Sequence, residues 1–183
     1  MAAPDVTQVH YTTGALIVAP TNLTGPDYGG TRLGIIDSCR LTPITRNFFI
    51  TAEEYGGETV DEVYLGRDWI LTCTVRGYDN DSLDTLFPNT ADGSSSTKTV
   101  ISEPGGLLAG STNSGRAVKL LFAPEDSTQP GFLFYRAMPQ LRRAVNIDFR
   151  LNRETAFLTH WRGIRDASGR VIQIGRVEDL TVS

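Results

Sequence analysis

The sequence has few lysines, cysteines and histidines, and it contains no long apolar run. Only two of its 17 basic residues are lysines, and its 183 residues include two cysteines and two histidines. No segment approaches the ~20 apolar residues that cross a membrane as a helix, and the first basic residue is Arg32, so we predict neither a membrane span nor a signal peptide. Two isolated thiols, Cys39 and Cys73, are typical of small buried side chains in a reducing compartment. We therefore expect a soluble protein made in a cytoplasm.

The residues that catalysis or metal binding require are also scarce. His10 and His160 are more typical of surface positions than of a general base, and no GxSxG, HExxH or CxxC motif is present. Asp79 and Asp81 begin like a calcium loop, but its later ligands are missing. The stretch 110–117 resembles a phosphate loop but places an arginine where that motif needs lysine. We predict no catalytic residue, no cofactor and no metal site, so the protein is not expected to be an enzyme.

Charge is unevenly distributed along the chain. The formal net charge is −4, which disfavours a freely basic nucleic-acid-binding protein. Residues 1–98 hold 13 acids and 6 bases, whereas residues 99–183 hold 8 acids and 11 bases. Arginine suits ion pairs between proteins, so an acidic first half and an arginine-rich second half favour binding between copies of the chain. Chance scatter would produce the same numbers, and both interpretations remain open here.

Most of the apolar pattern has the period of two that is typical of β-strands. Residues 145–151 alternate apolar and polar without a break, and residues 69–76 present one apolar face. A turn at Asp166–Gly169 is expected to join the last two strands as a hairpin. The fold class is therefore mainly β, an antiparallel β-sandwich or partial barrel. Further strands are predicted at 15–19, 33–41, 47–52, 60–65, 117–122, 132–138, 155–164 and 170–175.

One short α-helix and one long loop interrupt this pattern. Residues 79–82 offer several N-cap side chains, Leu83, Leu86 and Phe87 share one helix face, and a proline at position 88 ends the helix. The loop 88–114 is rich in Ser, Gly and Thr, and loops of that length are functional or mobile. Either the loop becomes ordered against another subunit, or it is an idle insert. The first alternative is suggested by its apolar pairs, Val100 with Ile101 and Leu107 with Leu108.

Five acids gather around one predicted turn. Like charges at this density repel one another unless they are solvated or faced by bases. The bases that face them in an assembly are expected among the arginines of the C-terminal strands, although a plain solvated rim remains the alternative. The candidates for contact between subunits are the acids Glu53, Glu54, Glu58, Asp61 and Glu62 and the arginines Arg142, Arg143, Arg150 and Arg153, with Arg162 and Arg165 also considered.

These segments together resemble the tail tube proteins, or major tail proteins, of tailed bacteriophages. The resemblance is carried by the stretches 51–57, 60–61, 64–69 and 76–81, by the helix that ends at Pro88, and by residues 156–170. It extends over roughly residues 14–88 and 115–180. The motifs are a pattern of strands, turn and helix without a catalytic signature.

The resemblance implies a virion structural protein with a single domain over residues 1–183. Such subunits self-assemble into stacked hexameric rings, and their strands join a ring-wide barrel around a hollow tail tube. Genome DNA passes through that lumen without sequence-specific binding, and a negative wall lets it slide. Residues 1–13 would form an N-terminal arm that, like the loop 88–114, reaches neighbouring subunits. Tape-measure, tail-terminator and tail-tip proteins are the further partners that the resemblance implies, with no membrane partner.

Other functions remain possible at this point. A neck or tail-completion ring protein, or the tube of a phage-like secretion device, belongs to the same structural class. A monomeric β-sandwich binding module belongs to a different one, and Trp69, Tyr135 and Trp161 would then line a groove for a glycan. Large aromatic side chains in strands more often belong to the core.

Overall fold

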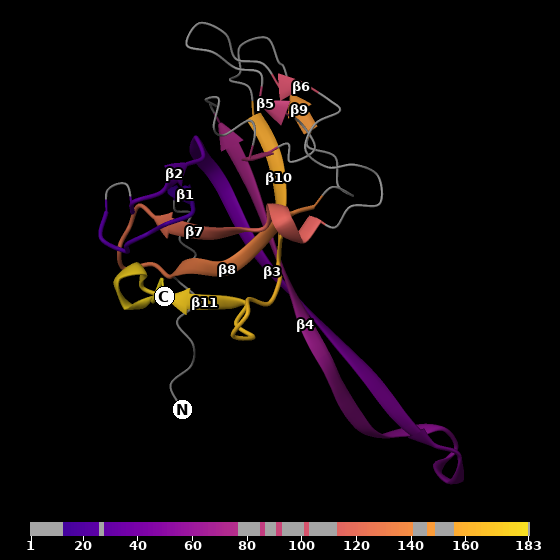
Figure 1. The fold of residues 1–183 in the computed structure, drawn as a ribbon. Coiled ribbons are helices and arrows are strands. Elements are labelled where there is room, and N and C mark those ends of the chain that lie inside the picture. The colour runs from indigo at the N-terminus through magenta and orange to yellow at the C-terminus, as the bar shows by residue number, and fades with distance from the viewer. Residues whose placement is uncertain are drawn as a thin grey trace, which may run out of the picture.

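The computed structural model describes residues 13–25, 28–76, 85–86, 91–92, 101–102, 113–140, 146–148 and 156–182. Almost all of its regular structure is β (Figure 1), with short 3₁₀ helices at Glu53–Tyr55, Asn113–Arg116 and Val177–Asp179. The strands are β1 (Gly14–Val18), β2 (Thr31–Arg32), β3 (Ile35–Ala52), β4 (Glu58–Arg76), β5 (Ala91–Asp92), β6 (Ile101–Ser102), β7 (Val118–Pro124), β8 (Gly131–Pro139), β9 (Asn146–Asp148), β10 (Ala156–Gly163) and β11 (Ile172–Gly175).

Six antiparallel strands close into a hydrogen-bonded ring. The order runs β8, β7, β1, β3, β4 and β10, and β10 pairs again with β8. Two of the strand pairings in this ring are short: β1 pairs with β3 only at Gly14 and Ile36, and β10 pairs with β8 at three positions. Of the other strands, β11 pairs with β8, β9 with β10 and β2 with β1. The mainly β, antiparallel fold predicted from the sequence is confirmed, in the form of a partial barrel.

The inside of the barrel is filled by every second residue of its strands. β10 alternates half-buried and buried positions, which places Phe157 and Trp161 in the core. Cys39 and Cys73 face each other across β3 and β4 with their sulfur atoms 2.7 Å apart, both as free thiols. Burial, with the neighbouring thiol, raises the pKa of Cys73. The thiols predicted to be isolated are therefore adjacent, since the strand register brings together positions that lie far apart in the sequence.

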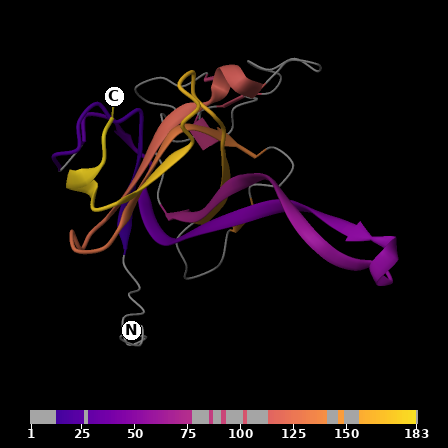
Figure 2. The same ribbon diagram turned by 90° about the horizontal axis from the view of Figure 1, so that it is seen from below.

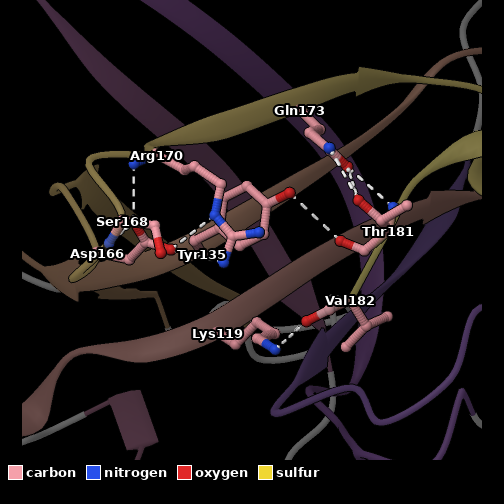
Figure 3. A network of polar contacts seen from close by, with 8 residues as sticks. All are labelled: Lys119, Tyr135, Asp166, Ser168, Arg170, Gln173, Thr181 and Val182. Atoms are coloured by element: carbon pink, nitrogen blue, oxygen red, sulfur yellow. Dashed lines mark hydrogen bonds and ion pairs between the residues drawn. The ribbon is translucent and has the colours of Figure 1, made fainter.

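A second apolar layer lies on the opposite face of β1, β7 and β8. It contains Ile17, Leu121, Leu133 and Tyr135, and Leu180 of the C-terminal segment packs on it. Figure 3 shows how polar contacts hold that segment: the Thr181 backbone N–H donates to Gln173 Oε1 at 2.9 Å, and Lys119 Nζ donates to the Val182 carbonyl.

The same region holds the turn between β10 and β11. The Arg170 guanidinium lies over the Tyr135 ring at 4.0 Å and pairs with Asp166 (Figure 3). Desolvation raises the pKa of Asp166, but hydrogen bonds from the Arg170 backbone and side chain outweigh it and lower the pKa overall. The prediction that this turn closes a hairpin is wrong. β10 and β11 do not pair with each other but lie end to end along the same edge of β8, β10 at residues 137–139 and β11 at residues 131–134. The alternating pattern does not reveal which strands are neighbours.

Two long strands replace four predicted short ones. β3 runs from Ile35 to Ala52 and β4 from Glu58 to Arg76, each without a break. The sequence pattern had indicated interruptions near Pro43 and Gly66. A strand with an open edge tolerates the missing N–H of proline, and Gly66 sits at an irregularity in the strand register with a φ of +125°.

Several predictions fall mainly outside the described residues. Of the predicted helix, residues 85–86 are helical, and Leu86 is buried in the barrel core. Ile101 lies in β6, which pairs with β5 within the predicted long loop. The other residues named for that loop, Val100, Leu107 and Leu108, lie outside the described residues, as does the N-terminal arm up to residue 12.

Candidate functional site

The most distinctive feature of the molecule is a two-stranded ribbon that projects from the barrel. β4 pairs with β10 only between Ile70 and Arg76, whereas its pairing with β3 continues to Ala52 and Glu58. Figures 1 and 2 show β3 and β4 leaving the barrel together. We call residues 43–69 the β3–β4 ribbon. Its ten residues on β3 extend roughly 30 Å at the usual strand rise.

Large apolar side chains are exposed along this ribbon. Phe48, Phe49 and Tyr64 are 60%, 57% and 61% exposed, respectively. Ile44, Phe48 and Ile50 occupy alternate positions of β3 and so share one face, with Val63 paired to Phe48. The full set of exposed large apolar residues on the ribbon is Ile44, Phe48, Phe49, Ile50, Val60, Val63, Tyr64 and Leu65. A concentration of this kind is typical of a surface that another protein covers.

The ribbon also has two open edges in the part of the chain that the structure describes. β3 pairs on its outer side only through Ile36, and β4 has no second partner beyond Ile70. Open edges offer unpaired N–H and C=O groups to another strand. Edges and apolar faces together make the ribbon the candidate functional site.

The tip of the ribbon carries the acidic cluster predicted from the sequence. The turn uses Gly56 and Gly57, both at positive φ, and follows the 3₁₀ helix Glu53–Tyr55. All five acids are exposed, and residues 47–65 contain no arginine or lysine. Asn47 Nδ2 donates to Glu62, and no ion pair joins the five acids to a described base. The tip is therefore a concentrated negative charge.

The predicted partners of these acids are only partly described. Arg142, Arg143, Arg150 and Arg153 lie outside the described residues, so their pairing stays a prediction. Arg162 and Arg165 are described, and both lie at the base of the ribbon where it leaves the barrel.

A cavity of about 290 Å³ opens at that base, and we call it the arginine pocket. Asp68 is shared by two guanidinium groups, Arg162 at 2.8 Å and Arg46. A hydrogen bond from Arg162, aided by Arg46, holds the pKa of Asp68 below its ordinary value, although desolvation pulls the other way. The pocket is lined by Arg46, Leu65, Gly66, Arg67, Asp68, Arg162, Gly163, Ile164, Arg165 and Val171.

Sequence reasoning missed Arg46 and Arg67 as members of this site. They flank the acidic stretch at equal distances from its turn, and the register Thr45 to Arg67 and Arg46 to Gly66 places them in neighbouring residue pairs of the ribbon. Treating residues 43–69 as one hairpin around Gly56 and Gly57 would have found them.

The aromatic residues considered for a glycan groove do not form one. Trp161 is 1% exposed inside the barrel, and Trp69 is half-buried against the same core beneath the Arg67 guanidinium. Tyr135 belongs to the apolar layer on the opposite face. These side chains are core, so the groove prediction is wrong.

Neither a metal cluster nor a membrane helix is found in the described part of the chain. No group of three or more His, Cys, Asp or Glu side chains gathers there as metal ligands would. None of the described helices has the length and apolar character to span a bilayer.

Comparison with known proteins gives a loose likeness to two solved structures. No family model and no curated protein matches the chain. A chain from the virion of the native gene transfer agent particle overlaps at a TM-score of 0.47 and 11% identity, over 87% of this chain and 95% of that one. A chain from the tail of the empty particle, which has C6 symmetry, overlaps at 0.39 and 12%, over 81% and 89%. Overlaps this loose carry no argument about what the present chain does.

Proposed function

We propose that this protein is a structural subunit of a phage-like tail, with no enzymatic activity, and that its β3–β4 ribbon binds further copies of the chain. The observation that carries the proposal is the ribbon itself, with open edges and exposed apolar side chains along about half of two long strands. A two-stranded ribbon is marginal in water without further strands or a covered apolar face. Assembly supplies both, and the sequence resemblance to tail tube proteins points to the same purpose.

In the finer form of the proposal, six copies of a single domain form a ring and the rings stack into a tube. The ribbon of each copy lies against a neighbour, which covers its apolar face and satisfies its edges. Genome DNA passes through the lumen without sequence-specific binding, and tape-measure, tail-terminator and tail-tip proteins contact the tube ends. The subunit is made in the host cytoplasm and resides in the virion tail.

Two other assemblies use the same surface. A neck or tail-completion ring protein would form rings that never stack, and the tube of a phage-like secretion device would stack in the same way. The monomeric binding module is disfavoured, because the aromatic residues it would use are in the core. A monomer would leave the large apolar side chains of the ribbon exposed to water.

Electron microscopy tests the proposal directly. Purified protein is imaged by negative stain and weighed by light scattering over a range of concentration and salt. We expect rings or tubes of uniform width, and sixfold symmetry in end views. Rings without tubes would support the neck protein instead, and a 20.0 kDa monomer under every condition would contradict the proposal.

A pair of variants then tests the ribbon. Phe48→Thr with Val63→Thr removes two apolar side chains from one ribbon face while keeping residues that favour strands. Burying such a side chain contributes roughly 1.5–3 kcal/mol, so the pair should abolish or strongly weaken assembly. The matched control is Ile35→Thr with Ile174→Thr, which removes exposed apolar side chains from the barrel. Equal effects of the two pairs would contradict the assignment of the ribbon.

A further inference from the structure

We propose that the arginine pocket at the base of the ribbon receives the acidic ribbon tip of a second copy of the chain. This inference rests on the proposed self-assembly and names the contact that joins one copy to the next. The ligand class is a group of carboxylates on a tight turn, and the pocket and the tip are the two halves of one contact.

The pocket has more positive charge than its own residues neutralise. Four arginines are among its lining residues, Arg46, Arg67, Arg162 and Arg165, and Asp68 is the only acidic residue among them. Asp68 already accepts from both Arg46 and Arg162. An anion entering the pocket therefore meets an excess of donors, and guanidinium groups bind carboxylates through two parallel hydrogen bonds.

One of these arginines is already held in place. Arg67 Nε donates to Thr45 Oγ1 at 3.1 Å, and its guanidinium lies 5.5 Å from the centre of the Trp69 ring. A donor that is fixed before binding loses less conformational entropy when its partner arrives. Arg67 is also among the residues that line the pocket.

The pocket also has the size and the walls for a turn. Its volume is about 290 Å³, and Gly66 and Gly163 contribute no side chains to its lining. Nothing lies within 4 Å of the position that a Cβ on Gly66 would take. Leu65, 63% exposed, and Ile164 and Val171 add apolar surface beside the arginines. That mixture suits a tip in which the exposed Val60 accompanies the acids.

The acidic tip cannot reach the pocket of its own chain. Arg46 pairs with Gly66, and the ribbon remains paired up to Ala52 and Glu58. Six further residue pairs separate the base of the ribbon from its tip by roughly 20 Å at the usual rise. The partner must be another copy, and a contact between two different patches of identical chains repeats from copy to copy.

A charge-swap experiment on the full-length protein tests this contact. The tip variant is Glu53→Lys with Glu54→Lys and Glu58→Lys, and the pocket variant is Arg67→Glu with Arg165→Glu. Arg46 and Arg162 are kept because they hold Asp68. The control for the pocket variant is Arg32→Glu with Arg176→Glu, which makes the same charge change as the pocket variant at exposed positions away from the pocket. The readout is the protein concentration at which light scattering and negative-stain images first show assemblies.

Each reversal alone should raise that concentration about tenfold or more at low salt, since several charge pairs are lost at once. A mixture of the tip variant with the pocket variant should recover assembly, because the lysines on the tip of one variant can then bind the glutamates in the pocket of the other. Millimolar inorganic triphosphate should compete with the tip in the wild type and have no added effect on the pocket variant. Sodium chloride at equal ionic strength controls for screening.

The outcomes separate this contact from the proposed function. If the wild type assembles and both reversals behave like the control, the contact is overturned and the proposed function stands. If the wild type stays monomeric in every condition, both are overturned. Circular dichroism confirms that each variant is folded, and Arg165→Gln alone provides a milder pocket change with a smaller effect in the same direction.

Discussion

The same two strands build the barrel wall and the ribbon, and they behave differently in the two places. Within the barrel, Leu71, Cys73 and Val75 of β4 are fully buried. Beyond Ile70 the same strand continues, but Val63, Tyr64 and Leu65 are exposed because none of the described segments covers them. The barrel is therefore stabilised by its own contacts, whereas the apolar side chains of the ribbon become buried only when another molecule covers them.

The largest effect is expected in the barrel. Phe134→Ala removes a side chain that is fully buried among core residues, and changes of this kind cost about 3–5 kcal/mol. Urea unfolding of the monomer, followed by fluorescence, measures it. A loss below about 1 kcal/mol would mean that the barrel is not the stable unit of the molecule.

A second substitution probes how tightly the barrel is packed. A Cβ on Gly163 would lie 2.8 Å from two ring carbons of Phe134, so Gly163→Ala should destabilise the monomer by about 1–3 kcal/mol. Gly115→Ala is the matched control, because nothing lies within 4 Å of its Cβ position. Equal unfolding midpoints for the two variants would show that the packing near Gly163 is loose.

The junction between barrel and ribbon should respond to pH. Because arginines lower the pKa of Asp68, the ionised carboxylate stabilises the fold above the ordinary value of 3.8, and that stabilisation is lost as pH falls through the lower folded value. Asp68→Asn should cost about 1 kcal/mol or less at pH 7, and the difference from wild type should shrink below pH 3.8. Urea unfolding across pH checks this, and a difference that does not vary with pH would contradict it.

The smallest effect on the monomer is expected on the ribbon. Phe48 is 60% exposed, so Phe48→Thr should change the free energy of unfolding by about 0.5 kcal/mol or less. The same variant should weaken assembly. Urea unfolding and light scattering on one preparation measure the free energy of unfolding and the extent of assembly. A large loss of monomer stability without a change in assembly would contradict the account, because the ribbon would then stabilise the monomer and not the contact between copies.

The fold was largely predictable because alternation is a local signal. The pattern of β10 and β8 was evident from the sequence, and so was the acidic turn near Gly56. The pairing of strands was not, since it depends on contacts between distant segments. For that reason the pairing of both β10 and β11 with β8, and not with each other, and the contact between Cys39 and Cys73 emerged only from the structure.

The candidate site was half predictable. Five clustered acids are evident in any reading of residues 53–62, whereas the arginine pocket combines residues from β3, β4 and the end of β10. The ribbon was not predicted because Pro43 and Gly66 are residue types that usually interrupt strands. An open edge and a register irregularity accommodate them here.

Hydrogen exchange of the backbone amides, compared between monomer and assembled protein, tests the central claim most directly. In the monomer, amides of residues 44–65 should exchange much faster than those of β7 and β8, because the ribbon has two strands and no covering layer. In the assembly those ribbon amides should become protected while the barrel changes little. A ribbon as protected as the barrel in the monomer, or unchanged by assembly, would contradict the account.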